Sequence, residues 1–467
     1  MDVAAPARSG VSPLALCAGL ILALALSGCA TYSDSFGAVQ RSLASQQYDG
    51  ALKTIEKQSG DKTDRVLYLL NKGMVLRMKR DFVGSNQALA AAKAEMERLY
   101  AASVSQHAMS FLINDATVSY GGEDYEQVLV HLYMALNYLE LGQKNEARVE
   151  AVQVDLKLRE IGEKVSGGKY TQDAFSLYLT GMIYEELQEW SDAMISYRDA
   201  YKAYKKYQAA YGTPMPDSLK HDLLRMAVRQ GLKDEARQYG KEFGLSLTPT
   251  EGQSSKDGEL VFILNNGLAP IKREKVGTFL APPPAAFSRG DASTPAVYVT
   301  IALPYYESRL NRIAGARISA AGKQASTELM ENIDAIARSS LDSHMAAITA
   351  RSIARAVVKA KFQEAVDRAG QRNNDAGAAL LGSIVARVAA VATERADTRS
   401  WLTLPAEIDM ARLDLPPGEY TVKVELLGAG GETVSTSEFP GVVIKEAHNT
   451  YLTQHWTPPY QPSTARR

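Results

Sequence analysis

Small residues recur inside helix-like segments through the first half of this chain, and they constrain its fold more than any other feature. Apolar side chains there follow three- and four-residue spacing, which predicts helices. The clearest unit covers residues 177–200, with Gly181 and Ala193 as its small positions. Small side chains allow two antiparallel helices to cross closely, and Tyr184 and Tyr197 are placed to fill the space beside that crossing.

Other stretches share this spacing. Gly73 is the small position of a second unit, and Ala135 and Ala147 are those of a third. The units resemble the tetratricopeptide repeat (TPR), a helical pair that recurs about every 34 residues. The units here are spaced more widely than that. We therefore expect insertions between them, at 97–124 and 160–172.

Weaker units at 48–55 and 224–243 extend the array, so we expect an all-α, TPR-like solenoid over residues 38–247. Stacked repeats of this kind form a curved array whose concave face usually binds peptides. The alternative is a helical domain that binds no ligand. Tyrosines recur every three or four residues over 197–211, and either core packing or a contact face explains that stripe.

The second half of the chain has a different pattern. Polar turn-forming residues at 248–258 predict a linker. We expect a β-rich domain over 259–460 with an antiparallel β-sandwich-like fold, which makes the chain an α+β multidomain protein. Alternating apolar segments predict its strands at 259–264, 296–303, 406–412, 420–427, 434–439 and 442–446.

A helical insertion at 328–396 interrupts these strands, and its first part has the spacing of one amphipathic helix or two. Arg351, Arg355 and Lys359 recur every fourth residue, so they share a face. That face is either solvated or contacts anionic headgroups or an acidic partner. Residues 376–393 are almost entirely apolar, with small residues at every fourth position. They form either a buried helix or an oligomerising or membrane-touching hairpin.

Residues 1–28 have the pattern of a secretory signal peptide. Their apolar stretch is too short to span a bilayer comfortably, and it ends at Cys29 in the lipobox-like run Leu-Ser-Gly-Cys. We expect cleavage before Cys29, acylation of this residue and a short tether over 29–37. Ala30 stands where aspartate would signal inner-membrane retention, so we expect an outer-membrane lipoprotein facing the periplasm. The alternative is an ordinary leader with an incidental cysteine.

Composition and motifs argue against several classes of function. The net charge is −1 with no long run of one sign, which disfavours nucleic-acid binding. Cys17 lies in the leader, so Cys29 is the one cysteine of the mature chain, and neither a disulfide nor a cysteine zinc site can form within it. The sequence has no phosphate-binding loop, paired-histidine metal motif or serine elbow. We expect no catalytic residue, no metal and no cofactor.

Four stretches outside the repeats are distinctive: Ser-Tyr-Gly-Gly-Glu-Asp-Tyr at 119–125, Asn-Gly-Leu-Ala-Pro at 266–270, Ala-Leu-Pro-Tyr at 302–305 and the run at 394–407. Together with the lipobox they resemble a family of uncharacterised proteobacterial TPR outer-membrane lipoproteins. The resemblance covers nearly the whole chain. It implies work in the cell envelope or cell wall, and no enzymatic activity is known for the family.

We therefore expect a lipid-anchored periplasmic scaffold or adaptor that binds another cell-envelope protein. One alternative is an assembly or secretion component that oligomerises or contacts the membrane through residues 328–396. A second is a cell-wall enzyme, for which Glu394, Asp397 and Glu407 are the available carboxylates. Because arginines such as Arg399 lie among them, structural salt bridges are the simpler interpretation.

Overall fold

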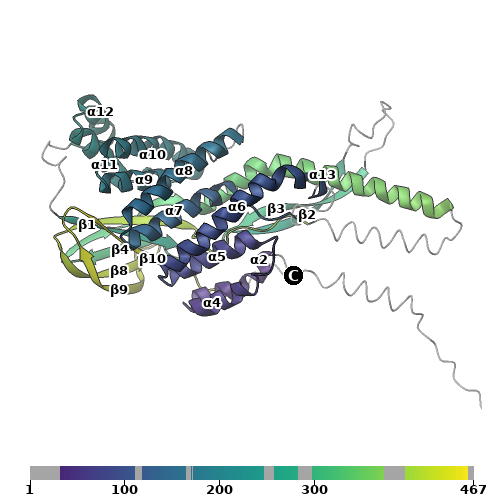
Figure 1. Ribbon diagram of the computed structural model, residues 1–467, viewed down its shortest axis with the longest axis horizontal. Helices are drawn as coiled ribbons and strands as arrows, with labels where there is room; N and C mark the ends of the chain where they lie inside the picture. Colours follow the sequence, from purple (N-terminus) through teal and green to yellow (C-terminus); the bar gives the residue numbers. More distant parts are fainter. Residues whose placement is uncertain are drawn as a thin grey trace, which may run out of the picture.

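A computed structural model describes residues 32–110, 118–164, 170, 172–246, 257–281, 297–372 and 395–460. The predicted leader, Cys29, most of the predicted linker and the apolar run 376–393 lie outside these residues. Within them the molecule is α+β: a block of helices lies along packed β-sheets, and a long arm extends from one end (Figure 1).

Within the described residues, helices α3 to α12 form five consecutive pairs joined by short turns, and each pair also packs on the next. Each predicted repeat unit falls on one pair. Long second helices, α6 with 29 residues and α8 with 21, account for much of the wide repeat spacing. The pairs are α3 (Gly37–Ala44) with α4 (Tyr48–Glu56), α5 (Arg65–Met78) with α6 (Phe82–Ser110), α7 (Asp124–Glu140) with α8 (Lys144–Lys164), α9 (Ala174–Glu186) with α10 (Trp190–Tyr211), and α11 (Asp217–Arg229) with α12 (Lys233–Phe243).

The predicted tether is part of the folded body from α2 (Tyr32–Ser35) onward. Tyr32 Oη accepts a hydrogen bond from Asn71 Nδ2 at 2.8 Å, and Ser33 Oγ donates to the carbonyl of Lys272 at 3.2 Å. The following Phe36 is buried in the helical core. A free tether over 29–37 is therefore wrong for residues 32–37, because Phe36 adds its apolar side chain to that core.

Two four-stranded sheets and a separate hairpin account for the strands of the described residues. The first sheet has the order β10-β1-β7-β6, the second has the order β5-β4-β8-β9, and β2 pairs with β3. The strands predicted at 434–439 and 442–446 form one continuous strand, β9. The bounds are β1 (Gly258–Asn266), β2 (Ile271–Ala281), β3 (Val297–Glu307), β4 (Gly315–Ala320), β5 (Lys323–Ser326), β6 (Glu328–Asn332), β7 (Glu407–Leu415), β8 (Gly418–Leu427), β9 (Thr433–Ile444) and β10 (Asn449–Trp456).

The two four-stranded sheets pack face to face around an apolar cluster of their own. Phe262 in β1, Ile318 in β4 and Val424 in β8 belong to this cluster and are fully buried. β1 runs antiparallel to β7 but parallel to β10, so the expected all-antiparallel arrangement is wrong at this edge. Parallel neighbours need a long connection, and nearly the whole second half of the chain lies between β1 and β10.

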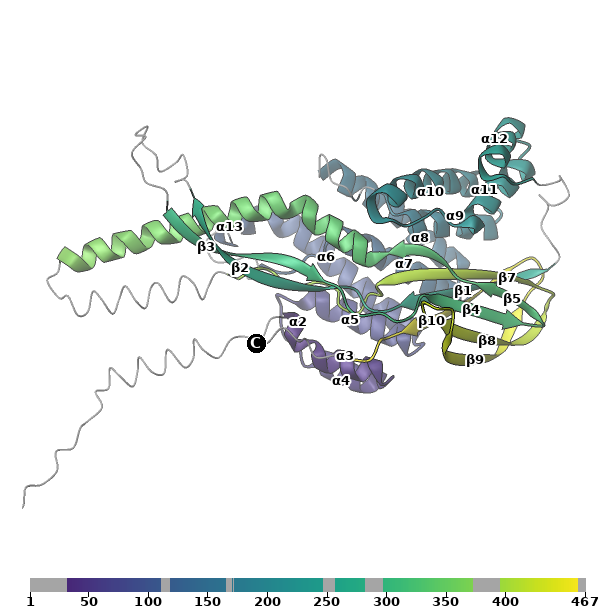
Figure 2. The same ribbon diagram turned by 180° about the vertical axis from the view of Figure 1, so that it is seen from behind.

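The predicted helical insertion begins later than expected and contains one long helix, α13 (Ile333–Arg372). Glu328–Asn332 is strand β6, which pairs with β7. Asn332 Oδ1 then accepts a hydrogen bond from Ala335 N at 2.8 Å and caps the helix. Beyond the body, α13 packs on β3, and together with the hairpin β2–β3 it makes the arm seen in Figure 2. No helix within the described ranges is long and apolar enough to cross a membrane.

The helices and the first sheet share one continuous core. Val261 in β1 and Met410 in β7 lie in the same buried cluster as Tyr133 in α7. Tyr133 Oη donates a hydrogen bond to Asn265 Oδ1 at 2.9 Å, and its ring packs edge-on against Trp401 with 6.1 Å between ring centres. The two parts that the sequence suggested as separate domains are thus packed together as one body.

This packing fills the surface that was expected to bind a partner. α5, α7 and α9 are the first helices of their pairs, and all three contact the sheet side of the molecule. Arg77 Nη2 in α5 donates to Thr453 Oγ1 in β10, and Arg412 Nη1 in β7 donates to Tyr178 Oη in α9, both at 2.9 Å. The sheet side of the molecule therefore covers the inner side of these three helices.

Candidate functional site

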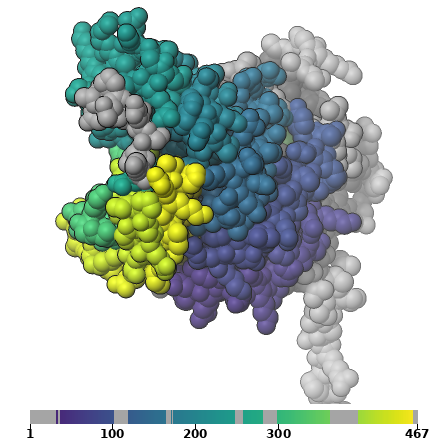
Figure 3. Space-filling view, turned by 60° about the vertical axis from the view of Figure 1, so that its left-hand side comes forward, coloured from purple at the N-terminus to yellow at the C-terminus, as the bar shows by residue number. Residues whose placement is uncertain are grey.

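A polar cleft opens where the last helical pairs separate from the sheets. It encloses about 660 Å³ between helices α9–α11 and strands β1, β7 and β10. In Figure 3 the last helices (teal) and the strands (yellow and green) form separate lobes on this face. Carboxylates outnumber arginines on its walls, which include Glu185, Glu186, Asp222, Asp257, Glu259 and Asp414 together with Arg225, Arg229 and Arg412.

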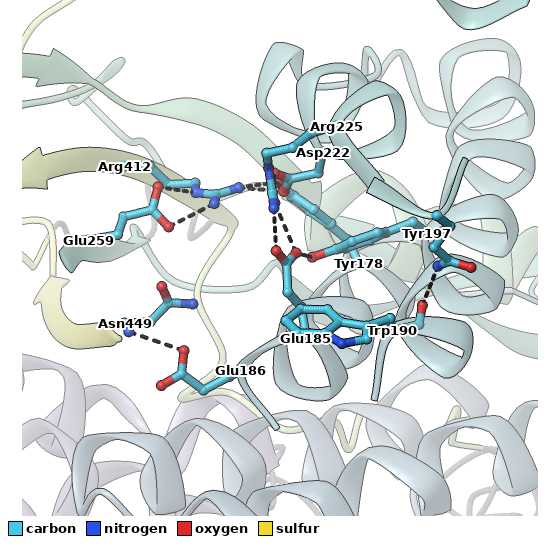
Figure 4. A network of polar contacts seen from close by, with 11 residues as sticks. Tyr178, Glu185, Glu186, Trp190, Tyr197, Asp222, Arg225, Glu259, Arg412 and Asn449 are labelled. Carbon is cyan, nitrogen blue, oxygen red and sulfur yellow. Dashed lines mark hydrogen bonds and ion pairs between the residues drawn. The ribbon is translucent and has the colours of Figure 1, made fainter. Parts of the chain in front are cut away.

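Arg412 joins the two sides of this cleft (Figure 4). It lies on β7 and forms a two-pronged salt bridge with Glu259 of β1, Nε to Oε1 and Nη2 to Oε2, both at 2.7 Å. Its Nη1 donates to Asp222 in α11 as well as to Tyr178 Oη. Asp222 is buried, so one guanidinium fastens two helices and two strands together.

Arg225 repeats this arrangement among the helices. It lies three residues after Asp222 on α11, so the two side chains share a face. Its Nη2 donates to Asp222 Oδ1 at 2.7 Å and to Glu185 Oε2 at 2.9 Å. Tyr197 Oη in α10 donates to the same Glu185 oxygen at 2.7 Å. These bonds hold α9, α10 and α11 in fixed relative positions.

The pKa values of Arg412 and Asp222 are shifted toward their charged forms, whereas burial raises the pKa of Glu259. Burial alone would lower the pKa of Arg412, but Asp222 and Glu259 outweigh burial and raise this pKa well above its usual value. Burial would raise the pKa of Asp222, but Arg412 and Arg225 hold it below its usual value. Groups that stay ionised and bonded to one another are poor general acids or bases. The network forms the charged base of the cleft and holds its side chains in fixed positions.

The rim of the cleft carries groups that face solvent. The guanidinium carbon of Arg229 lies 3.7 Å from the centre of the Trp190 ring, so the two form a flat, stacked surface. Gln188 and Asp414 are exposed on opposite sides of the opening. Lys144 pairs with Glu186, and Lys323 Nζ lies 3.9 Å from Asp257 Oδ2, so exposed Asp414 is the wall carboxylate best placed to meet a basic ligand.

A smaller cleft of about 260 Å³ lies at the root of the arm, between the start of α7, the hairpin, α13 and residues 395–397. Three of the four stretches that resemble the lipoprotein family contribute to it. Its charged groups are largely paired: Lys272 with Glu123, and Arg395 Nε with Glu274 Oε1 at 2.9 Å. The pairing indicates a structural junction.

Buried Glu126 joins two of these stretches. Its carboxylate accepts hydrogen bonds from Tyr120 Oη at 2.5 Å and from Trp401 N at 2.7 Å. Burial, and then the nearby charge of Glu123, raises the pKa of Glu126 from 4.5 to about 7. The run around Trp401 therefore closes onto α7, the first helix of the third pair.

Of the carboxylates considered for an enzyme, Asp397 and Glu407 lie among the described residues, and each is engaged by a different partner. Glu394 lies outside the described residues. Asp397 Oδ2 lies 2.7 Å from Arg399 Nη2, and Glu407 Oε1 accepts a hydrogen bond from Asn332 Nδ2 at 3.1 Å. Over the same described ranges, no group of three or more histidine, cysteine, aspartate or glutamate side chains is placed to hold a metal ion.

The residues predicted for repeat packing lie at helix contacts. A Cβ atom on Gly181 would lie 2.4 Å from the Tyr197 ring, and one on Gly73 would lie 2.7 Å from Leu89. Tyr184 is half-buried beside the crossing of α9 and α10. The predicted alanines are buried in the helical core: Ala135, Ala147 and Ala193.

The basic residues of α13 do not form one exposed face. Arg351 is exposed at the smaller cleft and Lys359 is half-buried, but Arg355 is only 3 % exposed. The common basic contact face is therefore wrong at Arg355, because α13 packs on β3 along this stretch. Cys29, the predicted lipidation site, lies outside the described residues.

Sequence reasoning missed the residues of the large cleft. Arg412 and Asp222 are 190 positions apart, and Arg412 and Glu259 are 153 apart, so no local motif joins them. The available signal was a charge inside the apolar strand Ile-Asp-Met-Ala-Arg-Leu, since a buried charge needs a partner.

Comparisons with known proteins leave the chain without a family. No family model matches it, and no curated protein matches it. Among solved structures, the crystal structure of MamA protein is 12% identical, covering 46% of this chain and 96% of that chain, with a TM-score of 0.29. Aspartyl phosphate phosphatase F from Bacillus subtilis is 15% identical, covering 49% of this chain and 53% of that chain, with a TM-score of 0.32. Identities and scores this low assign neither family nor function.

Proposed function

We propose that this protein is a non-catalytic, lipid-anchored scaffold of the cell envelope that holds a basic segment of another envelope protein in the large cleft. The observation that carries this proposal is the cleft itself, about 660 Å³ of open space with carboxylate-rich walls. Buried ion pairs fix those walls before any ligand arrives. A preformed site loses little conformational freedom on binding, which favours affinity.

The helical pairs support a protein partner. Arrays of TPR-like pairs commonly bind peptides on their inner surface. Here the first sheet fills that surface, while the cleft stays open at α9, α10 and α11. Half-buried Trp190 offers apolar contact there, and exposed Asp414 is placed to meet lysine or arginine side chains.

The anchor is part of the same proposal, and its support is the lipobox-like run at Cys29. Changing Cys29→Ser removes the thiol that would receive the first lipid. We expect an unprocessed or soluble protein, measured by fractionating cells that produce the parent and the variant. A Cys29→Ser protein that stays in the outer membrane like the parent contradicts the lipid anchor.

Site-specific photocrosslinking in intact cells tests the binding cleft. A photoreactive amino acid at Gln188, on the rim, should crosslink a partner, whereas one at exposed Ile195 on the outer side of α10 should not. Asp414→Lys should lower the yield of the Gln188 crosslink about tenfold, because it places a positive charge opposite a basic segment. Asp234→Lys on α12, whose side chain is 96% exposed, is the matched control and should change little.

The crosslinked peptide of the partner identifies the chemistry. Mass spectrometry should place the Gln188 crosslink in a segment rich in lysine or arginine. A crosslink to an acidic segment, or an equal yield from Gln188 and Ile195, overturns the proposed role of the cleft.

A further inference from the structure

The arm carries an apolar surface that the scaffold role leaves unused. β2 and β3 pair along eleven residues each, and α13 covers one face of this hairpin. Val299 and Ile301 on that face are buried in a small cluster with Val357 of α13. Since side chains alternate between the two faces of a strand, the residues between them point the other way.

That opposite face is exposed toward the end of the hairpin, where the polar pair Thr278–Thr300 lies between apolar positions. Leu280 is 59% exposed and pairs with Tyr298, which is 76% exposed. Val276, four residues before Leu280 and therefore on the same face, is 58% exposed. Exposed apolar residues scattered singly need no explanation, but several on one face mark a contact surface. Tyrosine beside aliphatic residues is typical of the membrane–water interface.

The N-terminus ties this hairpin to the expected lipid anchor. Cys29 precedes Tyr32 by three residues, which reach at most about 10 Å when extended. Ser33, the next residue of α2, bonds to Lys272 near the start of β2. A strand rises about 3.3 Å per residue, so Leu280 lies roughly 26 Å along β2 from that point. Figure 2 shows α2 at the root of the hairpin, on the side away from α13.

We infer that the apolar end of the hairpin β2–β3 rests in the interfacial layer of the membrane and, with the lipid on Cys29, fixes the orientation of the molecule. The inference rests on the proposed anchor, because a lipid at Cys29 brings the bilayer to the root of the arm. The arm then lies along the membrane. α9, α11 and β1, which border the cleft, lie at the opposite end of the molecule from the arm (Figure 1), so the cleft faces the periplasm.

Vesicle binding by the lipid-free chain tests the arm without the anchor. Residues 30–467 contain no cysteine, so single cysteines can be introduced as labelling sites. An environment-sensitive dye at Tyr298→Cys should shift to the blue on adding vesicles of phosphatidylethanolamine and phosphatidylglycerol. The same dye at Ile195→Cys, a site 53% exposed on α10, should not shift.

Negative charge on the apolar face should weaken vesicle binding. Leu280→Asp with Tyr298→Asp should lower the vesicle-bound fraction at least tenfold in flotation, because a carboxylate resists entry into the interface. Ile195→Asp with Val434→Asp, exposed by 53% and 44% elsewhere, is the matched control and should bind like the parent. Both variants replace exposed residues, so both should melt like the parent.

Two results overturn the inference. One is equal vesicle binding by the arm variant and the parent. The other is a parent that sediments as a dimer, together with an arm variant that sediments as a monomer and a control variant that remains a dimer. The second result would assign the face to another copy of the chain. The vesicle experiment uses protein that carries no lipid. A failure of Cys29 lipidation in cells would therefore contradict the proposed anchor without changing the result of the vesicle experiment.

Discussion

Single residues set the distances between neighbouring helices. Gly181 on α9 lies directly against the ring of Tyr197 on α10, where no side chain atom fits without displacing the ring. The sequence predicted this contact because a glycine and an aromatic residue recur at fixed positions in a repeat. The partners of Arg412 had no comparable signal, since they come from distant parts of the chain.

The change Gly181→Ala tests the helix crossing. The new Cβ would lie 2.4 Å from the Tyr197 ring, so we expect overpacking to lower the free energy of unfolding by about 1–3 kcal/mol. Gly162→Ala in α8 is the control, because nothing lies within 4 Å of a Cβ there and alanine favours helix. Urea denaturation measures both. Equal stabilities for the two variants would contradict a close crossing at Gly181.

The change Arg412→Met tests the charge network. It leaves the buried carboxylate of Asp222 without its main partner, and breaking a buried ion pair typically costs about 3–5 kcal/mol. Arg237→Met on α12 removes an arginine that is 77% exposed, and its stability should change by less than about 0.5 kcal/mol. Thermal melting compares them. A small effect of Arg412→Met would show that the two sides of the cleft are held together by other contacts.

The helices and strands differ in how well their sequence patterns predicted them. The helical pairs were predictable because apolar spacing and small residues repeat along one helix face. β6 was predicted as helix because its five residues, Glu-Leu-Met-Glu-Asn, favour helix locally, and pairing with β7 overrides that preference. Strand β10 has few apolar residues, and its place beside β1 comes from a contact across the whole domain.

Strand β7 carries a buried acid that should make stability depend on pH. Burial, and then the charge of Glu407, raises the pKa of Asp409 from 3.8 to about 8. The folded protein thus keeps a proton that the unfolded chain releases above about pH 4. Stability from this group should fall by about 1.4 kcal/mol per unit as the pH rises from about 4 to about 8.

The change Asp409→Asn removes that titration and keeps an acceptor for Asn266 Nδ2. The urea midpoints at pH 5 and pH 8 should differ less in the variant than in the parent. The variant's gain in stability over the parent should be largest at pH 8. Asp414→Asn, an exposed position on the same strand, should keep the parent's difference. A variant with the parent's pH dependence would rule out Asp409 as its source.

At the scale of the whole molecule, the two expected domains share a core. Polar residues at 248–258 correctly suggested a change from helices to strands. They gave no sign that the face of the first sheet would pack on α5, α7 and α9, because each half has an amphipathic pattern that a separate domain would also show. The pattern identifies an apolar face, but it does not identify what covers that face.

Fragments test this coupling. Because the boundary is buried and apolar, residues 30–248 and 258–467 should each unfold without a sharp cooperative transition when produced alone, and they should form a one-to-one complex when mixed. Calorimetry and size-exclusion chromatography measure these outcomes. Two fragments that melt cooperatively and do not associate would restore the picture of independent domains.

The parallel pairing of β10 with β1 would also set the order of events in the proposed export to the periplasm. β10 is the last strand of the described chain, and Thr453 within it bonds to Arg77 near the beginning, 376 positions away. The core therefore cannot close until the end of the chain has emerged. A chain threaded through a translocation pore from its N-terminus would stay open for the whole passage, so chaperones that shield unfinished β-sheets would meet it before folding is complete.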